Sequence, residues 1–155
     1  GIHTAVETNG SSPRLLELFP FIDQLIMDCK HWYASRHLAY TKVPMEVVVG
    51  NLKAAVHKRG QVDIRIPLIG GVNDSEEDMQ GFVALFRELI GVSHGREKES
   101  SRVTFEILRY HEYGRHKWKD CGWEYQMTDK AHVTTEQICR FREMLMAGGL
   151  NYKHS

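Results

Sequence analysis

Four short apolar runs, separated by stretches with helical periodicity, constrain the fold of this chain more than any other feature. The runs cover residues 2–6, 25–29, 62–69 and 103–110. The third run alternates apolar and polar residues strictly, as does a strand with one buried face. Strands that alternate with helices are typical of βαβ units and a parallel sheet. The sequence therefore predicts an α/β fold: a partial (β/α) TIM-like barrel in which helices cover the outer face of a parallel sheet.

Capping patterns and glycines mark the expected helices. A short helix should follow Ser12, and a longer one should occupy residues 44–60. Two capping-box patterns then open further helices, one formed by Asp74 with Glu77 and one by Thr134 with Gln137. No linker or internal repeat divides the sequence, so residues 1–155 are expected to form a single domain.

Four other segments carry weaker signals. Residues 30–42 and 113–125 are polar and aromatic without a clear period. Residues 93–102 are interpreted as a solvated loop, and residues 150–153 as a final short strand.

Charge and cysteine content exclude several classes of function. Lys and Arg total 20, as do Asp and Glu, so the formal net charge is zero. This balance gives no basic footprint for nucleic acid or an anionic membrane, and no apolar run is long enough to span a bilayer. Cys29, Cys121 and Cys139 are too widely spaced for a disulfide framework or a zinc motif, so a reducing, cytoplasmic compartment is expected.

Charged residues within the predicted strands point to a binding site. A parallel strand buried on both faces is nearly all apolar, yet Glu7, Asp28, Arg65 and Glu106 lie in or at the ends of the runs. One face of the sheet should therefore be wet, with a ligand at the carboxyl ends of the strands. His111 follows the fourth run at the same edge.

Three alternatives remain open at this stage. Glu7, Asp28 and Arg65 could instead form a structural ion network that braces the barrel. The chain could be part of an ordinary (β/α) barrel lyase or isomerase that uses Lys30 or Glu7 as acid or base. It could also be a non-catalytic half-barrel that only binds a partner. The five-residue spacing of His111 and His116 argues against a two-histidine metal site, and no phosphate-binding or nucleophile motif occurs.

Four motifs, in order and spacing, resemble those of one known family. They are ETNG at 7–10, IMDCK at 26–30, IRIPLIGGVNDSEED at 64–78 and LRYHEYGRHKW at 108–118. Together they resemble the glycyl-radical-enzyme activating enzymes of the radical S-adenosylmethionine (SAM) superfamily, with the pyruvate formate-lyase type as the nearest branch. The resemblance covers nearly the whole chain.

The resemblance implies an oxidoreductase that uses SAM and a [4Fe-4S] cluster to form a glycyl radical on a partner. The partner would be a glycyl radical enzyme of the pyruvate formate-lyase type, and flavodoxin or ferredoxin would supply the electron. The cofactors carry the radical chemistry, so no residue of the chain is assigned as catalytic. The positions matching the family's SAM and monovalent-cation region are Glu7, Thr8, Asp28, Lys30, Arg65 and His111.

The sequence departs from the family pattern in one important respect. The family's C-x3-C-x2-C cluster motif is absent, and the three scattered cysteines cannot replace it. The expectation is therefore a C-terminal part of a radical SAM barrel that lacks the N-terminal cluster-binding segment. Such a chain is expected to be inactive alone.

Overall fold

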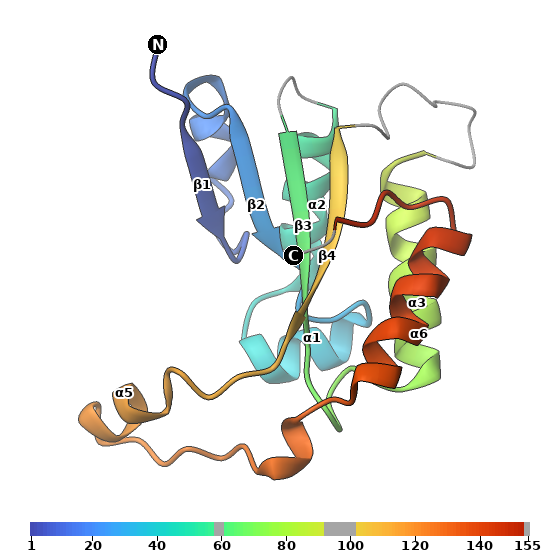
Figure 1. Ribbon diagram of the computed structural model, residues 1–155. Helices are drawn as coiled ribbons and strands as arrows, with labels where there is room; N and C mark the ends of the chain where they lie inside the picture. Colours follow the sequence, from blue (N-terminus) through green and yellow to red (C-terminus); the bar gives the residue numbers. More distant parts are fainter. Residues whose placement is uncertain (58–60, 92–101, 154–155) are drawn as a thin grey trace.

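The computed structural model describes residues 1–57, 61–91 and 102–153, and its centre is a parallel four-stranded sheet. The strands are β1 (Ala5–Thr8), β2 (Gln24–Asp28), β3 (Gln61–Leu68) and β4 (Val103–Arg109). They lie side by side in sequence order and all run in one direction (Figure 1). This order confirms the predicted parallel α/β sheet.

Helices connect successive strands. Between β1 and β2 lies the 3-10 helix η1 (Leu15–Phe21), and between β2 and β3 lie α1 (Ala34–Thr41) and α2 (Met45–Val56). The connection from β3 to β4 contains α3 (Glu76–Leu89). After β4 come α5 (Arg115–Asp120), the 3-10 turn η3 (Asp129–Ala131) and α6 (Thr135–Ala147).

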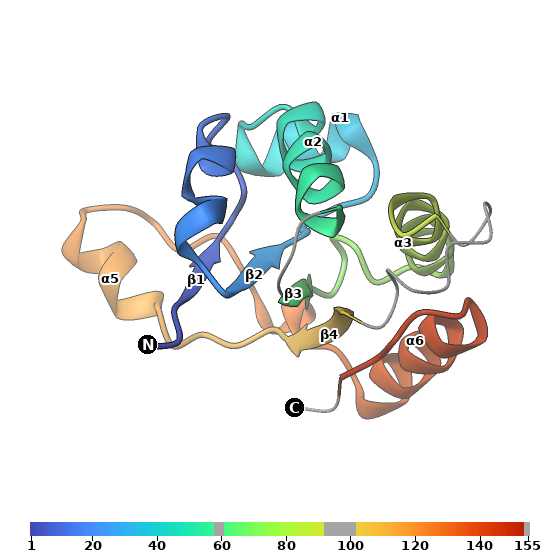
Figure 2. The same ribbon diagram turned by 90° about the horizontal axis from the view of Figure 1, so that it is seen from above.

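The helices cover one side of the sheet, as the partial-barrel prediction requires. Figure 2 shows η1, α1, α2 and α3 on one side of the curved sheet, with α6 beside α3 beyond β4. Helix α5 projects away from the other helices, below the carboxyl ends of the strands in Figure 1. Within the part of the chain that the structure describes, neither view shows a helix packed on the opposite face of the sheet.

The core lies between the sheet and the helices. The apolar residues of β3 that alternate along the strand are buried: Val62, Ile64, Ile66 and Leu68. Four phenylalanines extend this core between α3, α6 and β4, with stacked or tilted rings: Phe82, Phe86, Phe105 and Phe141. The predicted periodicity of residues 62–69 thus gives the buried face directly.

Three expected element boundaries differ in the structure. Ile2 is 90% exposed and the first strand begins at Ala5, so the expected strand over residues 2–6 was placed too early. Residues 150–153 form a single bridge, between Tyr152 and Phe105, rather than a strand. Helix α2 ends at Val56, before the expected stop at Gly60. The expected loop at 93–102 lies almost wholly outside the described residues.

The predicted capping box at Asp74 and Glu77 is wrong by one residue. Ser75 caps α3, accepting a hydrogen bond from the Asp78 amide, and the Asp78 carboxylate accepts one from the Ser75 amide. Asp74 instead accepts from the Gly71 amide and from Gln137. The second predicted box, Thr134 with Gln137, is confirmed.

Among the residues that the structure describes, no helix combines the length and apolar character needed to cross a bilayer.

Candidate functional site

Three of the six predicted site residues line one cavity at the carboxyl edge of the sheet. The cavity has a volume of about 290 Å³ and is lined by Glu7 on β1, Asp28 at the end of β2, and His111 just after β4. The remaining wall is formed by Pro67, Ile69, Leu108, Arg109 and Tyr110. Because parallel strands end at the same edge, residues far apart in sequence meet there, as the sequence analysis expected.

Asp28 has one paired and one unpaired oxygen. Its Oδ2 accepts a hydrogen bond from the Lys30 ammonium at 3.0 Å, so Lys30 joins the cavity group through this ion pair. Its Oδ1 is buried and has no hydrogen-bond partner. An unsatisfied buried polar atom is costly, so Oδ1 is an unmet hydrogen-bond acceptor at the end of β2.

Arg65 lies at the centre of a row of charges that crosses the sheet. The strand register places it between Asp28 on β2 and Glu106 on β4. Its guanidinium contacts Glu106 at 2.8 Å and Glu7 at 2.9 Å. Burial alone would lower the pKa of Arg65, but the hydrogen bond and charge of Glu106, with Glu7, outweigh it and raise the pKa.

The geometry of Arg65 gives the bracing alternative a physical basis. Arg65 binds two carboxylates across β1, β3 and β4, which holds the inner wall together. It is not among the residues lining the cavity, so a contact between Arg65 and SAM stays a prediction.

Thr8 and His111 have local partners. The Thr8 hydroxyl accepts a hydrogen bond from the Gly10 amide at 3.1 Å, which closes the turn after β1, and Thr8 does not line the cavity. His111 stacks on Tyr113, with ring centroids 4.2 Å apart. The imidazole therefore lies at the cavity with one face covered by an exposed aromatic ring.

Asp63 belongs to the same inner wall, and the sequence analysis gave it no role. Burial alone would raise its pKa, but hydrogen bonds from Thr104, Gln61, Gln24 and Lys153 outweigh this and lower it. With four donors Asp63 is satisfied and acts as a structural anchor for β2, β3 and β4. Its alternation with Arg65 on β3 was the available signal, because the two must share a face.

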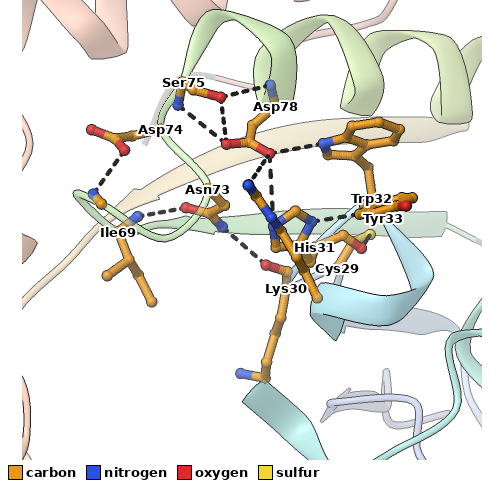
Figure 3. Close-up of polar contacts among 12 residues, drawn as sticks. Cys29, Lys30, His31, Trp32, Tyr33, Ile69, Asn73, Asp74, Ser75 and Asp78 are labelled. Carbon is orange, nitrogen blue, oxygen red and sulfur yellow. Dashed lines mark hydrogen bonds and ion pairs between the residues drawn. The ribbon is translucent and has the colours of Figure 1, made fainter. Parts of the chain in front are cut away.

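The sequence analysis also missed a buried polar network behind the carboxyl edge of the sheet, here called the rim (Figure 3). The Asn73 side chain contacts the backbone at Lys30, Pro67 and Ile69. Asp78 accepts hydrogen bonds from the Trp32 indole at 2.9 Å and from the Ser75 hydroxyl at 2.6 Å. This network ties the loop after β2 to the first turn of α3. No sequence pattern singles out a side chain that binds backbone atoms of distant loops.

His31 in this network should make the stability of the protein depend on pH. Its Nδ1 accepts from the Tyr33 amide at 3.1 Å, so the neutral ring carries its proton on Nε2, 3.7 Å from Asp78. Burial lowers the pKa of His31, although the Asp78 charge opposes this. Below about pH 6.5, His31 therefore binds a proton in the unfolded chain but not yet in the folded chain.

We expect the free energy of unfolding to fall as pH drops from about 6.5 toward the lower folded-state pKa. Urea unfolding at a series of pH values measures this. His31→Asn, whose Oδ1 can still accept from the Tyr33 amide, should flatten the dependence, whereas His116→Gln on α5 should leave it intact. Equal slopes for the wild type and His31→Asn would contradict the expectation.

The cysteines do not converge. Cys29 is buried, Cys121 is exposed and Cys139 is partly buried. Burial, with the nearby Asp28 charge, raises the pKa of the Cys29 thiol to about 12, which disfavours the thiolate that a metal needs. The described residues therefore do not fit an iron–sulfur cluster.

One mixed group of side chains, within the described ranges, brings potential metal ligands together. It consists of Glu112, Asp129 and His132, whose ligand atoms lie within 4.8 Å of one another. Arg115 already neutralises Glu112 at 2.9 Å, and Asp129 and His132 are exposed. We assign no metal to this group.

The fold and site together define an α/β half-barrel with a cavity at the carboxyl edge of its strands, lined by both charged and apolar residues. No protein-family model matches the chain. The choline trimethylamine-lyase activating enzyme of Oleidesulfovibrio alaskensis is 34% identical over 127 residues, which cover 81% of this chain. The pyruvate formate-lyase-activating enzyme of Staphylococcus epidermidis is 29% identical over 135 residues, or 82% of this chain.

The homologues are therefore glycyl-radical-enzyme activating enzymes, as the motifs predicted. The chain spans 39% of the first relative's length and 50% of the second's. Among solved structures, a domain of a pyruvate-formate lyase-activating enzyme from Bacteroides vulgatus matches with a TM-score of 0.71 at 22% identity. The match covers 99% of this chain and 81% of that domain, and it confirms the fold.

Proposed function

We propose that this chain is part of an activating enzyme that uses SAM and a [4Fe-4S] cluster to generate a glycyl radical on a partner enzyme. The observation that carries the proposal is the cavity where Glu7, Asp28 and His111 meet. The similarity to activating enzymes supports the assignment of the ligand.

The residues of the cavity suit a ligand that carries both signs of charge. Asp28 and Glu7 offer acceptors for an ammonium or hydroxyl group, while Lys30 and His111 offer donors for a carboxylate. Bound SAM would supply a 5′-deoxyadenosyl radical when an iron–sulfur cluster reduces it. The role of this chain would be to bind and orient SAM and to exclude water.

Several finer points belong to the same proposal. The partner would be a glycyl radical enzyme of the pyruvate formate-lyase type, flavodoxin or ferredoxin would donate the electron, and the location would be cytoplasmic. Because the described residues do not fit the cluster, its ligands must come from elsewhere, and this chain by itself would be inactive.

The direct test is SAM binding to the purified full-length protein by equilibrium dialysis. Removing the Lys30 ammonium or the Asp28 charge should weaken binding by about tenfold or more, since a charged hydrogen bond contributes about 1.5–3 kcal/mol. The variants are Lys30→Met and Asp28→Asn. Lys42→Met, on the C-terminal cap of α1 and outside the cavity lining, is the matched control and should bind SAM as the wild type does.

Wild-type binding no tighter than that of both cavity variants would overturn the proposal. Production of 5′-deoxyadenosine by the reconstituted enzyme is the second readout. If SAM binding is absent, borohydride trapping of Lys30 with carbonyl substrates would test the lyase alternative.

A further inference from the structure

The Asn73 side chain is fully buried and uses both ends of its amide on backbone atoms of the rim. Its Nδ2 donates to the Lys30 carbonyl at 2.9 Å and to the Pro67 carbonyl at 2.8 Å. Its Oδ1 accepts from the Ile69 amide at 2.8 Å. Figure 3 shows Asn73 between the loop that carries Lys30 and the turn that carries Ile69.

These bonds join the loop after β2 to the end of β3 and the turn that follows it. The first loop follows β2 and places the Lys30 ammonium on Asp28. The second segment comprises Pro67, near the end of β3, and Ile69 just after the strand, and both line the cavity wall. Asn73 itself does not line the cavity, so any influence it has on a ligand must pass through these backbone positions.

The attachment is specific to the geometry of an amide. Two carbonyl oxygens need two N–H donors from one group, and the Ile69 amide needs an acceptor 2.8 Å away. A carboxylate could accept from Ile69 but would face the two carbonyls with no donor. An alanine would leave all three backbone groups buried and unpaired, which is costly.

The other anchors of the Lys30 loop in the network lie beyond Lys30, beginning with His31, whose Nε2 is 3.7 Å from Asp78. Trp32 donates to Asp78, and Arg36 reaches the same carboxylate at 3.5 Å. These contacts fix the loop one or more residues beyond Lys30. Asn73 is the contact made at Lys30 itself.

We infer that Asn73 is a positioning residue: it sets where the Lys30 ammonium and the Ile69 wall stand at the SAM cavity without touching the ligand. The inference rests on the proposed function for the identity of the ligand. Loss of the two donated bonds frees the Lys30 backbone, so Lys30 meets the ligand carboxylate less often and affinity falls.

The test compares Asn73→Asp and Asn73→Ala with Leu145→Ala in the full-length protein. Leu145 is fully buried on α6, away from the rim, so its truncation weakens the fold without altering the cavity. Under conditions where all variants are folded, both Asn73 variants should bind SAM about tenfold more weakly than the wild type. This corresponds to the loss of about one net hydrogen bond between Lys30 and the ligand. Leu145→Ala should bind as the wild type does.

Amide hydrogen exchange gives a second readout that needs no ligand. The Ile69 amide should stay protected in Asn73→Asp, which keeps the acceptor, and exchange faster in Asn73→Ala. Wild-type SAM affinity in Asn73→Asp would overturn the inference while leaving the proposed function intact. No SAM binding by the wild type would overturn the proposed function and this inference with it.

Discussion

Replacing Arg65 with methionine is expected to destabilise the protein by about 3–5 kcal/mol, because it leaves a buried carboxylate without its counter-ion. The Glu106 side chain is only 7% exposed and relies on Arg65 at 2.8 Å. Glu7, the second partner, is 61% exposed and can return to water. Urea or thermal unfolding of Arg65→Met measures the loss.

A double variant separates the lost ion pair from lost packing. Arg65→Met combined with Glu106→Leu replaces the pair by apolar groups and should recover most of the lost stability. Glu7→Gln should change the free energy of unfolding by less than about 1 kcal/mol, as for an exposed pair. If Arg65→Met alone proved neutral, the row of charges across the sheet would not brace it.

Truncation of Phe82 to alanine is expected to cost about 3–5 kcal/mol, as for other fully buried aromatic residues. Phe82 is fully buried on α3, with ring centroids 5.8 Å from both Phe86 and Phe141 and 6.2 Å from His31. Its loss would open a cavity that joins the helical core to the buried network behind the rim. Chemical denaturation gives the value.

Leu38→Ala on α1 is the matched control for Phe82→Ala. Leu38 is exposed, so its truncation should change stability by no more than about 0.5 kcal/mol. Comparable losses for the two variants would mean that the four phenylalanines do not form the centre of the core.

Elements with a clear apolar period were predictable from the sequence, and those held by other contacts were not. The strand β3 and the helix α6 follow their patterns closely. Helix α1 buries only His37, which bonds the Val43 carbonyl at 2.9 Å, so no apolar stripe marks it. Helix α5 buries no residue at all, so periodicity could not reveal it.

The capping box of α3 shows how a local signal can be ambiguous. The segment Asp74–Asp78 has the sequence DSEED, so a cap at Asp74 with Glu77 and a cap at Ser75 with Asp78 fit the pattern equally well. Tertiary contacts decide between them, because Asp78 also binds Trp32 and Asp74 also binds Gln137.

The site was predictable to the extent that parallel strands share an edge. That rule alone brings Glu7, Asp28 and His111 together, and the ion pair adds Lys30. The positions of Arg65 between two carboxylates and of Asn73 between two loops depend on side-chain geometry, which residue spacing does not encode.

The sequential order of the strands has a consequence for how the chain reaches its native state. Among the described residues, each of the four strands pairs only with the strand before or after it in the sequence, as the registers of Ala5 with Gln24, Leu25 with Val62 and Val62 with Val103 show. No contact between strands must wait for a distant terminus to return. The entropic cost of loop closure is thus divided among three strand pairings, β1 with β2, β2 with β3 and β3 with β4. The sheet can grow outward from whichever of these units forms first.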